Sequence, residues 1–224
     1  MTIDLSPELL KNFIVFEGID GSGQDTQAGL FRDYLKSLGY KVWLTSEPSK
    51  DLSSLGVTIR YILANEPSFP AASLQLLMVA DRAMHVEQIR KHLSEGYVVI
   101  TVRYLYTTLS YGFLEGLDIN WLIAINRTFP RPQAMFYLDL PANQALARVI
   151  SRSEKTGRPL DRFETLEKLD AGRRAFADLA SLCPEMKLVD ASGTPEEIAE
   201  RIRGLANLDL GIETQSQKPL DLFV

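Results

Sequence analysis

Short apolar runs alternate with amphipathic stretches along this chain, an alternation typical of a parallel β-sheet whose strands are joined by helices. The runs are hydrophobic throughout, which suits strands that are covered on both faces. With 224 residues and 46% hydrophobic content, the chain can bury the core of one domain. We therefore expect an α/β fold, with strands at residues 13–17, 41–45, 97–101, 134–140 and 187–190.

The ends of two helices can be recognised in the sequence. Apolar residues recur at helical spacing over residues 30–38, and Gly39 is placed to end that helix. The last helix begins at Thr194-Pro195-Glu196-Glu197, a capping box with proline in the first turn. Periodicity is then lost and the sequence turns polar. We expect one domain over residues 1–210 and a flexible tail over residues 211–224.

A glycine-rich turn lies between the first expected strand and the helix after it. In that position, backbone N–H groups and the positive end of the helix point at a phosphate. A glycine-rich turn without a ligand is the alternative interpretation. The residues expected to bind phosphate, and with it ATP, are Gly18, Ile19, Asp20, Gly21, Ser22, Gly23, Gln24, Asp25 and Thr26.

The turn departs from the phosphate-binding pattern G-x-x-x-x-G-K-[ST] at two positions. Gly18 and Gly23 match, but Gln24 stands in place of lysine and Asp25 in place of serine or threonine. A unit charge about 4 Å from a phosphate is worth roughly 4 kcal/mol at an effective dielectric near 20. Losing even part of it would slow phosphoryl transfer by orders of magnitude. The Asp25 carboxylate is a candidate Mg²⁺ ligand in place of the hydroxyl.

Charge and cysteine content indicate which partners and which cellular compartment to expect. The net charge of −5 gives no basic surface for broad nucleic-acid binding, so we expect no direct contact with DNA or RNA. The single cysteine, Cys183, excludes an intramolecular disulfide and fits a reducing compartment. No apolar run approaches the ~18 residues of a membrane span, and no signal pattern opens the sequence. The cytoplasm is the expected location.

Five short motifs resemble, in order and spacing, those of the thymidylate kinases, most closely the archaeal type, over roughly residues 12–203. They are Glu17-Gly-Ile-Asp-Gly-Ser-Gly23 with Thr26-Gln27, Thr45-Ser-Glu47-Pro48-Ser49, Ala80-Asp81-Arg82-Ala-Met-His85, Arg103-Tyr104-Leu-Tyr106-Thr107-Thr108-Leu-Ser-Tyr111, and Gly157-Arg158-Pro-Leu-Asp161-Arg162-Phe-Glu164.

The resemblance implies a P-loop nucleoside-monophosphate-kinase fold, with a five-stranded parallel sheet, helices on both faces and a lid at about residues 150–164. It implies transfer of the ATP γ-phosphoryl group to dTMP with Mg²⁺, a step in dTTP synthesis for DNA replication. The members of this family are usually homodimers.

The resemblance also implies site residues. Arg103 follows a strand at the edge where open α/β sheets bind ligands, and it matches an arginine that contacts the acceptor phosphate. Arg82 matches a residue that reads the base and Tyr111 one packed under the sugar; a surface salt bridge and a core tyrosine are the alternatives. The expected acceptor residues are Glu47, Met78, Arg82, Arg103, Thr108 and Tyr111. The expected catalytic residues are Arg103, Arg158 and Arg162.

Three further departures lie near the chemistry. Val102 replaces the family's aspartate before Arg103, and Gly112 replaces the glutamine after Tyr111. Met78 stands where an aromatic residue usually stacks on the base. A lid arginine is a candidate for the role of the missing lysine.

The tail carries a separate signal. Residues 217–224 fit Q-x-x-L-x-x-F-[aromatic or aliphatic], which resembles the peptide that docks replication proteins on the sliding clamp. Leu220 and Phe223 would enter an apolar pocket, with Gln217 and Val224 completing the contact. Docking of these residues on the parent domain is the alternative.

Two hypotheses follow. The first is a dTMP kinase with an altered phosphate loop. The second is a catalytically weak or inactive nucleotide-binding paralogue that is recruited to the sliding clamp. The retained acceptor residues favour the kinase.

Overall fold

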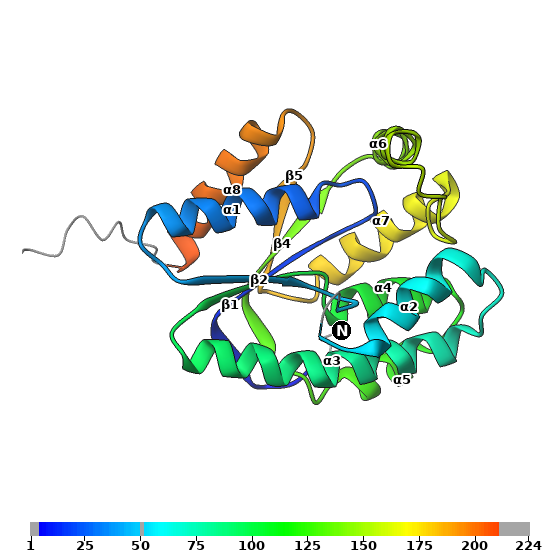
Figure 1. Ribbon diagram of the computed structural model, residues 1–224, viewed down its shortest axis with the longest axis horizontal. Helices are drawn as coiled ribbons and strands as arrows, with labels where there is room; N and C mark the ends of the chain where they lie inside the picture. Colours follow the sequence, from blue (N-terminus) through cyan, green and yellow to red (C-terminus); the bar gives the residue numbers. More distant parts are fainter. Residues whose placement is uncertain (1–4, 50–51, 211–224) are drawn as a thin grey trace, which may run out of the picture.

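The computed structural model describes residues 5–49 and 52–210, which build a five-stranded sheet (Figure 1). The strand order is β2-β3-β1-β4-β5, and each neighbouring pair is parallel. The expected α/β fold with a parallel five-stranded sheet is therefore confirmed. The strands are β1 (Leu9–Gly18), β2 (Val42–Ser46), β3 (Val98–Val102), β4 (Arg131–Asp139) and β5 (Met186–Asp190).

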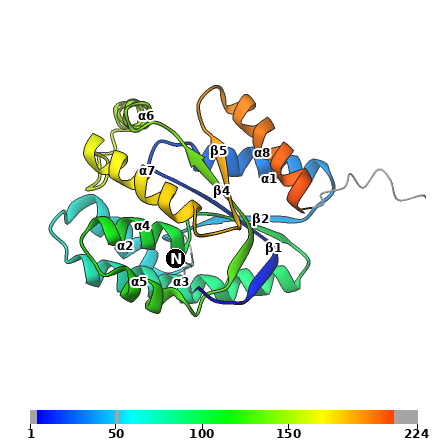
Figure 2. The same ribbon diagram turned by 180° about the vertical axis from the view of Figure 1, so that it is seen from behind.

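Helices cover both faces of the sheet (Figures 1 and 2). Helices α1 and α8 lie together on one face, whereas α3, α4 and α7 pack on the other. Helix α2 packs on α3, α5 on α4, and α6 beside α7. The helices are α1 (Gln24–Ser37), α2 (Ser54–Asn65), α3 (Ala71–Ser94), α4 (Leu105–Leu114), α5 (Ile119–Asn126), α6 (Ala142–Thr156), α7 (Leu166–Ala180) and α8 (Pro195–Leu210).

Aromatic packing fixes α1 against the central strands. The ring of Phe16 on β1 lies 5.9 Å from that of Phe31 on α1 and 5.3 Å from that of Phe136 on β4, centroid to centroid. All three side chains are buried. Because β1 and α1 are held at both sides of the glycine-rich turn, the turn between them has a fixed place at the edge of the sheet.

The helix ends confirm the expected capping. The N–H of Gly39 donates to the carbonyl of Lys36, 3.0 Å away, and Gly39 adopts φ 88°. At the start of α8, the N–H of Thr194 donates to Glu197 Oε2 at 2.8 Å and the N–H of Glu197 to Thr194 Oγ1 at 3.3 Å. These reciprocal bonds are the capping box that the sequence predicts.

The largest difference from the expected strands is in β1. Strand β1 begins at Leu9 rather than residue 13, and its register with β4 shifts between Leu10 and Ile14. Asn12 takes φ 60° in this irregular stretch. Its residues are mostly exposed, so they lack the continuous hydrophobicity from which the buried strands were expected.

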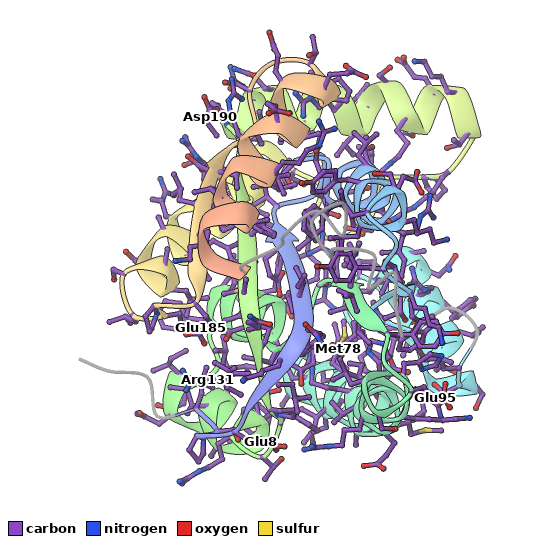
Figure 3. All side chains as sticks on the ribbon, turned by 90° about the vertical axis from the view of Figure 1, so that its left-hand side faces the viewer. Glu8, Met78, Glu95, Arg131, Glu185 and Asp190 are labelled. Atoms are coloured by element: carbon purple, nitrogen blue, oxygen red, sulfur yellow. The ribbon has the colours of Figure 1, made fainter. Side chains whose placement is uncertain are left out.

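The carboxyl ends of the parallel strands meet at one edge. Figure 3 shows Glu185, which precedes β5, and Asp190, which ends it, at the two ends of this strand, with Arg131 of β4 near Glu185. From the central β1 the chain builds β2 and β3 on one side and β4 and β5 on the other. Open α/β sheets bind ligands where the strand order reverses in this way.

Within residues 5–49 and 52–210, no helix is both long and apolar enough to cross a membrane.

Candidate active site

The glycine-rich turn forms a cradle at the end of β1. Gly21 and Gly23 adopt φ 84° and 99°, in the left-handed region that favours glycine. A Cβ on Gly21 would lie 2.3 Å from the carbonyl oxygen of Ala145, so no larger residue fits there. Gly23 caps α1, and no side chain of the described residues caps the helix. The first N–H groups of α1 therefore keep their capacity for an anion.

Gln24 lines the cavity over the turn but brings no charge to it. Its Nε2 donates to the carbonyl of Gly18, 2.7 Å away, and the side chain is buried. The bond ties the start of α1 to the end of β1. Ser22 is also buried, and its Oγ has no hydrogen-bond partner among the described residues. The turn is thus shaped by its own side chains, with backbone N–H groups left toward the cavity.

A large cavity of about 820 Å³ opens over the turn. It is lined by the turn, by α2, by the end of β3 and by α6 with the lid segment. Cationic side chains from several separate elements enter it. They are Arg60, Arg103, Arg148, Arg152 and Arg158. A cavity with this lining has the charge and the N–H donors to hold a polyphosphate.

A second cavity, of about 80 Å³, adjoins the first on the α3 and α4 side. Its lining includes the expected acceptor residues. They are Glu47, Met78, Arg82, Arg103, Thr108 and Tyr111. Asp20, Glu47 and Arg103 line both cavities, so the two hollows meet at these side chains.

Arg103 stands at that junction. It follows β3 with φ 68°, and its Nη2 donates to Asp20 Oδ1 at 2.8 Å. Burial is the largest influence and acts to lower the pKa of Arg103, but the surrounding acidic groups, Asp20 first among them, together outweigh it and raise the pKa. The N–H of Arg103 also donates to the carbonyl of Phe16 on β1, 2.9 Å away. Arg103 is therefore fixed next to the glycine-rich turn as a permanent cation.

Glu17 holds the backbone that follows Arg103 in place. This residue was not assigned to the site from the sequence alone. It is 0% exposed. Its carboxylate accepts the N–H groups of Tyr104 and Thr107 at 2.9 and 3.2 Å, and the hydroxyl of Thr107 at 2.7 Å. Burial raises the pKa of Glu17 to about 7 against these bonds and the nearby Arg103. The sequence did contain a signal for this role, because Glu17 is a charged residue between an apolar run and the first glycine of the motif.

Arg82 is buried, at 1% exposure, and belongs to a polar network instead of the surface salt bridge considered as an alternative. Its Nε donates to Glu47 Oε2 at 2.8 Å, its Nη2 to Thr108 Oγ1 at 2.9 Å, and its Nη1 to Asn126. Glu47 also bonds His85 Nδ1 at 3.0 Å. The network forms the floor of the second cavity and fixes the direction of the Arg82 guanidinium.

Tyr111 combines a core position with a place in the site. Its ring packs against Phe163, with centroids 4.7 Å apart, and its hydroxyl donates to Asp20 Oδ2 at 3.5 Å. Burial raises the pKa of Tyr111 strongly, so the hydroxyl stays protonated. Phe163 itself lines the second cavity and adds an aromatic face there.

The loop that carries Glu47 is fastened to α3. Asp81 Oδ2 accepts the N–H of Ser49 at 2.7 Å, and Asp81 Oδ1 accepts the hydroxyl of Ser53 at 2.7 Å. Ser53 caps α2, which carries Arg60 into the large cavity. Arg60 donates to the carbonyl of Pro48. Its position on α2, outside the five motifs, explains why sequence reasoning missed it.

Two of the lid arginines, Arg152 and Arg158, line the large cavity. Arg158 contacts Asp161 at 3.4 Å, and Arg152 pairs with Glu164 at 2.5 Å. Arg162 differs from expectation: within the described part of the chain it does not line either cavity. Its guanidinium pairs with Glu115, the residue after α4, and donates to the carbonyl of Phe69 at 3.1 Å. A buried ion pair holds it away from the phosphate cradle.

The cavity also has carboxylates suited to Mg²⁺. Asp25 lies in the first turn of α1 and lines the large cavity together with Asp20. Mg²⁺ commonly binds one or two carboxylates and takes its other ligands from water and substrate phosphates. The described residues hold no cluster of three or more His, Cys, Asp or Glu side chains for a metal ion. These residues therefore fit a Mg²⁺ ion that arrives with nucleotide phosphates.

Fold and site together define a P-loop protein of the nucleoside-monophosphate-kinase class. The family model described as "Thymidylate kinase" matches residues 16–202. Over 204 residues, the chain is 41% identical to a "Probable thymidylate kinase" of Pyrococcus horikoshii, covering 88% of this chain and 97% of that protein. It is 38% identical over 211 residues to a "Probable thymidylate kinase" of Thermococcus kodakarensis, covering 90% and 100%. It is 38% identical over 202 residues to a "Thymidylate kinase" of Syntrophotalea carbinolica, covering 85% and 92%. The chain belongs to the thymidylate kinase family.

Proposed function

We propose that this protein transfers the γ-phosphoryl group of ATP to dTMP and so makes ADP and dTDP. The observation that carries the proposal is the position of Arg103. It lines both cavities and is fixed by Asp20 beside the glycine-rich turn. A phosphoryl group passing between two nucleotides must cross such a junction, and a cation placed there stabilises the charge of the transition state.

The donor side of the site is the large cavity. The N–H groups at the start of α1 hold phosphate oxygens, and Arg158 approaches from the lid segment. Bound Mg²⁺ would supply charge neutralisation between the phosphates, with Asp25 as its ligand from the chain. Arg60 and Arg152 add positive charge on facing walls of the cavity. These arginines are the candidates for the role of the missing lysine; Arg162 is not.

The acceptor side is the second cavity. Arg82 presents donors from its fixed network, Met78 offers an apolar surface for a base, and Tyr111 closes the wall near Asp20. This lining suits a deoxypyrimidine monophosphate whose phosphate reaches Arg103. The family membership supports dTMP as that acceptor.

A coupled assay of ADP release with ATP, Mg²⁺ and a panel of nucleoside monophosphates tests the proposal. We expect turnover of dTMP well above that of AMP or GMP, and loss of turnover in Arg103→Ala. Arg174→Ala is the matched control, because Arg174 lies on α7 in an exposed pair with Asp170. Equal turnover of purine and pyrimidine acceptors would contradict the acceptor assignment.

The second candidate is a catalytically weak or inactive nucleotide-binding paralogue. The observation that favours it is the Gln24 side chain, which is neutral and held by the Gly18 carbonyl where the motif has a cation. In this case the clamp contact would be the main role. Its expected residues, Gln217, Leu220, Phe223 and Val224, lie outside the residues that the structure describes. Binding of ADP without any formation of dTDP would select this candidate.

We also propose that the chain forms a homodimer and works in the cytoplasm. The resemblance implies the dimer, and the buried, unpaired Cys183 suits a reducing compartment. The mass of the protein in solution, measured by light scattering, tests the dimer.

A further inference from the structure

We propose that Gln75 reads the base of the acceptor and selects a pyrimidine with an imide N–H, as thymine and uracil have. The inference deepens the proposed function, because it names the residue of the second cavity that chooses the acceptor. The sequence motifs did not single out Gln75, which lies before the Ala80–His85 motif on α3.

Gln75 faces the acceptor cavity from the same side of α3 as two expected acceptor residues. Met78 and Arg82 follow it by three and seven residues, spacings that place side chains on one helix face. All three line the second cavity. Met78 therefore lies between the amide of Gln75 and the guanidinium of Arg82 along this wall.

The amide of Gln75 is buried with unused bonding capacity. The residue is 2% exposed, and its Oε1 accepts no hydrogen bond from any residue that the structure describes. Buried polar groups in folded proteins nearly always have a hydrogen-bond partner. A ligand that donates a hydrogen bond in this cavity would be the partner of Gln75 Oε1.

Gly112 makes room for the amide. A Cβ at this position would lie 3.4 Å from Gln75 Cδ and 2.7 Å from Leu122 Cδ2. The thymidylate kinases that this sequence resembles carry a glutamine where this chain has Gly112. Here the residue after Tyr111 has no side chain, and the glutamine amide beside it comes from α3. The pair Gln75 and Gly112 thus keeps one amide in the pocket while changing the helix that provides it.

The chemistry of the wall favours a keto pyrimidine. The imide edge of thymine or uracil offers one N–H donor between two carbonyl acceptors. Gln75 Oε1 can accept the N–H, and Arg82, which has donors only, suits a carbonyl. Cytosine has an amino group in place of one of these two carbonyls, and that donor would face the Arg82 donors. Sites that hydrogen-bond a substrate strongly reject analogues that lack the partner group.

Calorimetric titration with dTMP, N3-methyl-dTMP and dCMP tests the inference without relying on turnover. The wild-type protein should bind dTMP at least about tenfold more tightly than either analogue. Gln75→Met should weaken dTMP binding about 10- to 100-fold and bring the affinities for dTMP and N3-methyl-dTMP close together, because methionine fills the space without an acceptor. The affinity for dCMP should stay lower, because its amino group still faces the Arg82 donors. Gln88→Met is the control on the same helix, since Gln88 does not line either cavity within the described residues.

Each outcome decides the matter. Equal binding of dTMP and N3-methyl-dTMP by the wild-type protein overturns the inference, even if Gln75→Met does not fold. Unchanged dTMP affinity in a folded Gln75→Met protein also overturns it. If the wild-type protein shows the expected selectivity but forms no dTDP, the proposed catalysis fails and the base contact stands. If it binds no pyrimidine monophosphate, both fail.

Discussion

Replacing Glu17 by glutamine should change how the stability of the protein depends on pH. The Glu17 carboxyl is fully buried, and burial raises its pKa from the ordinary 4.5 to about 7. Between these values the folded protein holds a proton that the unfolded chain has released. The free energy of unfolding should therefore fall as pH rises from about 4.5 through about 7. At roughly 1.4 kcal/mol per pH unit, the loss is about 3 kcal/mol.

The Glu17→Gln variant should escape this loss and still fold. A glutamine carbonyl accepts the N–H groups of Tyr104 and Thr107 as Oε1 of Glu17 does, and the Thr107 hydroxyl can turn to accept from the amide. Urea unfolding at pH 5, 6, 7 and 8 should show the variant gaining on the wild-type protein by about 2.5 kcal/mol across the series. For a chain of this size, that corresponds to roughly 5–10 °C in Tm.

Glu8→Gln is the control for that series. Glu8 is exposed, and its hydrogen bond to Arg90 lowers its pKa, so its replacement should give a flat difference between pH 5 and 8. A Glu17→Gln difference that stays constant over the same range would show that Glu17 does not titrate there. In that case the inference from its burial is wrong.

Three further outcomes are expected. Gln24→Lys with Asp25→Ser should raise dTMP phosphorylation at least about tenfold, because it restores the phosphate-loop pattern; a fall with Gln24→Lys alone would mean that the loop works with another cation. Arg82→Met should lower the free energy of unfolding in urea by about 3–5 kcal/mol, because it leaves the carboxylate of Glu47 buried without its arginine partner; a loss below about 1 kcal/mol would contradict the network. Truncation after Leu210 should abolish micromolar binding to a sliding clamp without changing nucleotide binding or Tm; a Tm lowered by several degrees would assign the tail to the core.

The sequence predicted the sheet because β3 and most of β1 and β4 are buried and hence continuously apolar. It did not predict the start of β1, where Leu9 and its neighbours are partly exposed and the register with β4 shifts. Capping residues were recognised correctly, since Thr194 and Glu197 act within one turn of the chain. Local signals of this kind need no knowledge of the tertiary structure.

The site was predictable where a residue belongs to a motif and less so where it depends on long-range packing. Arg103 was expected from its place after a strand, and it lies at the junction of the two cavities. Arg60 and Gln75 enter the cavities from helix positions outside the motifs, so no local pattern marked them. Arg162 has the spacing of a lid arginine, but the carboxylate that pairs with it belongs to Glu115, the residue after α4.

The central claim is that Arg103 acts on a phosphoryl group passing from the large cavity to the second one. The most direct measurement is single-turnover transfer of label from γ-³²P-ATP to dTMP, with dTDP followed by rapid quench. Wild-type protein and Arg174→Ala should form labelled dTDP, and Arg103→Ala should form it about 10²–10³-fold more slowly. Labelled dTDP formed by Arg103→Ala at the wild-type rate, or no labelled dTDP from the wild-type protein, would contradict the claim.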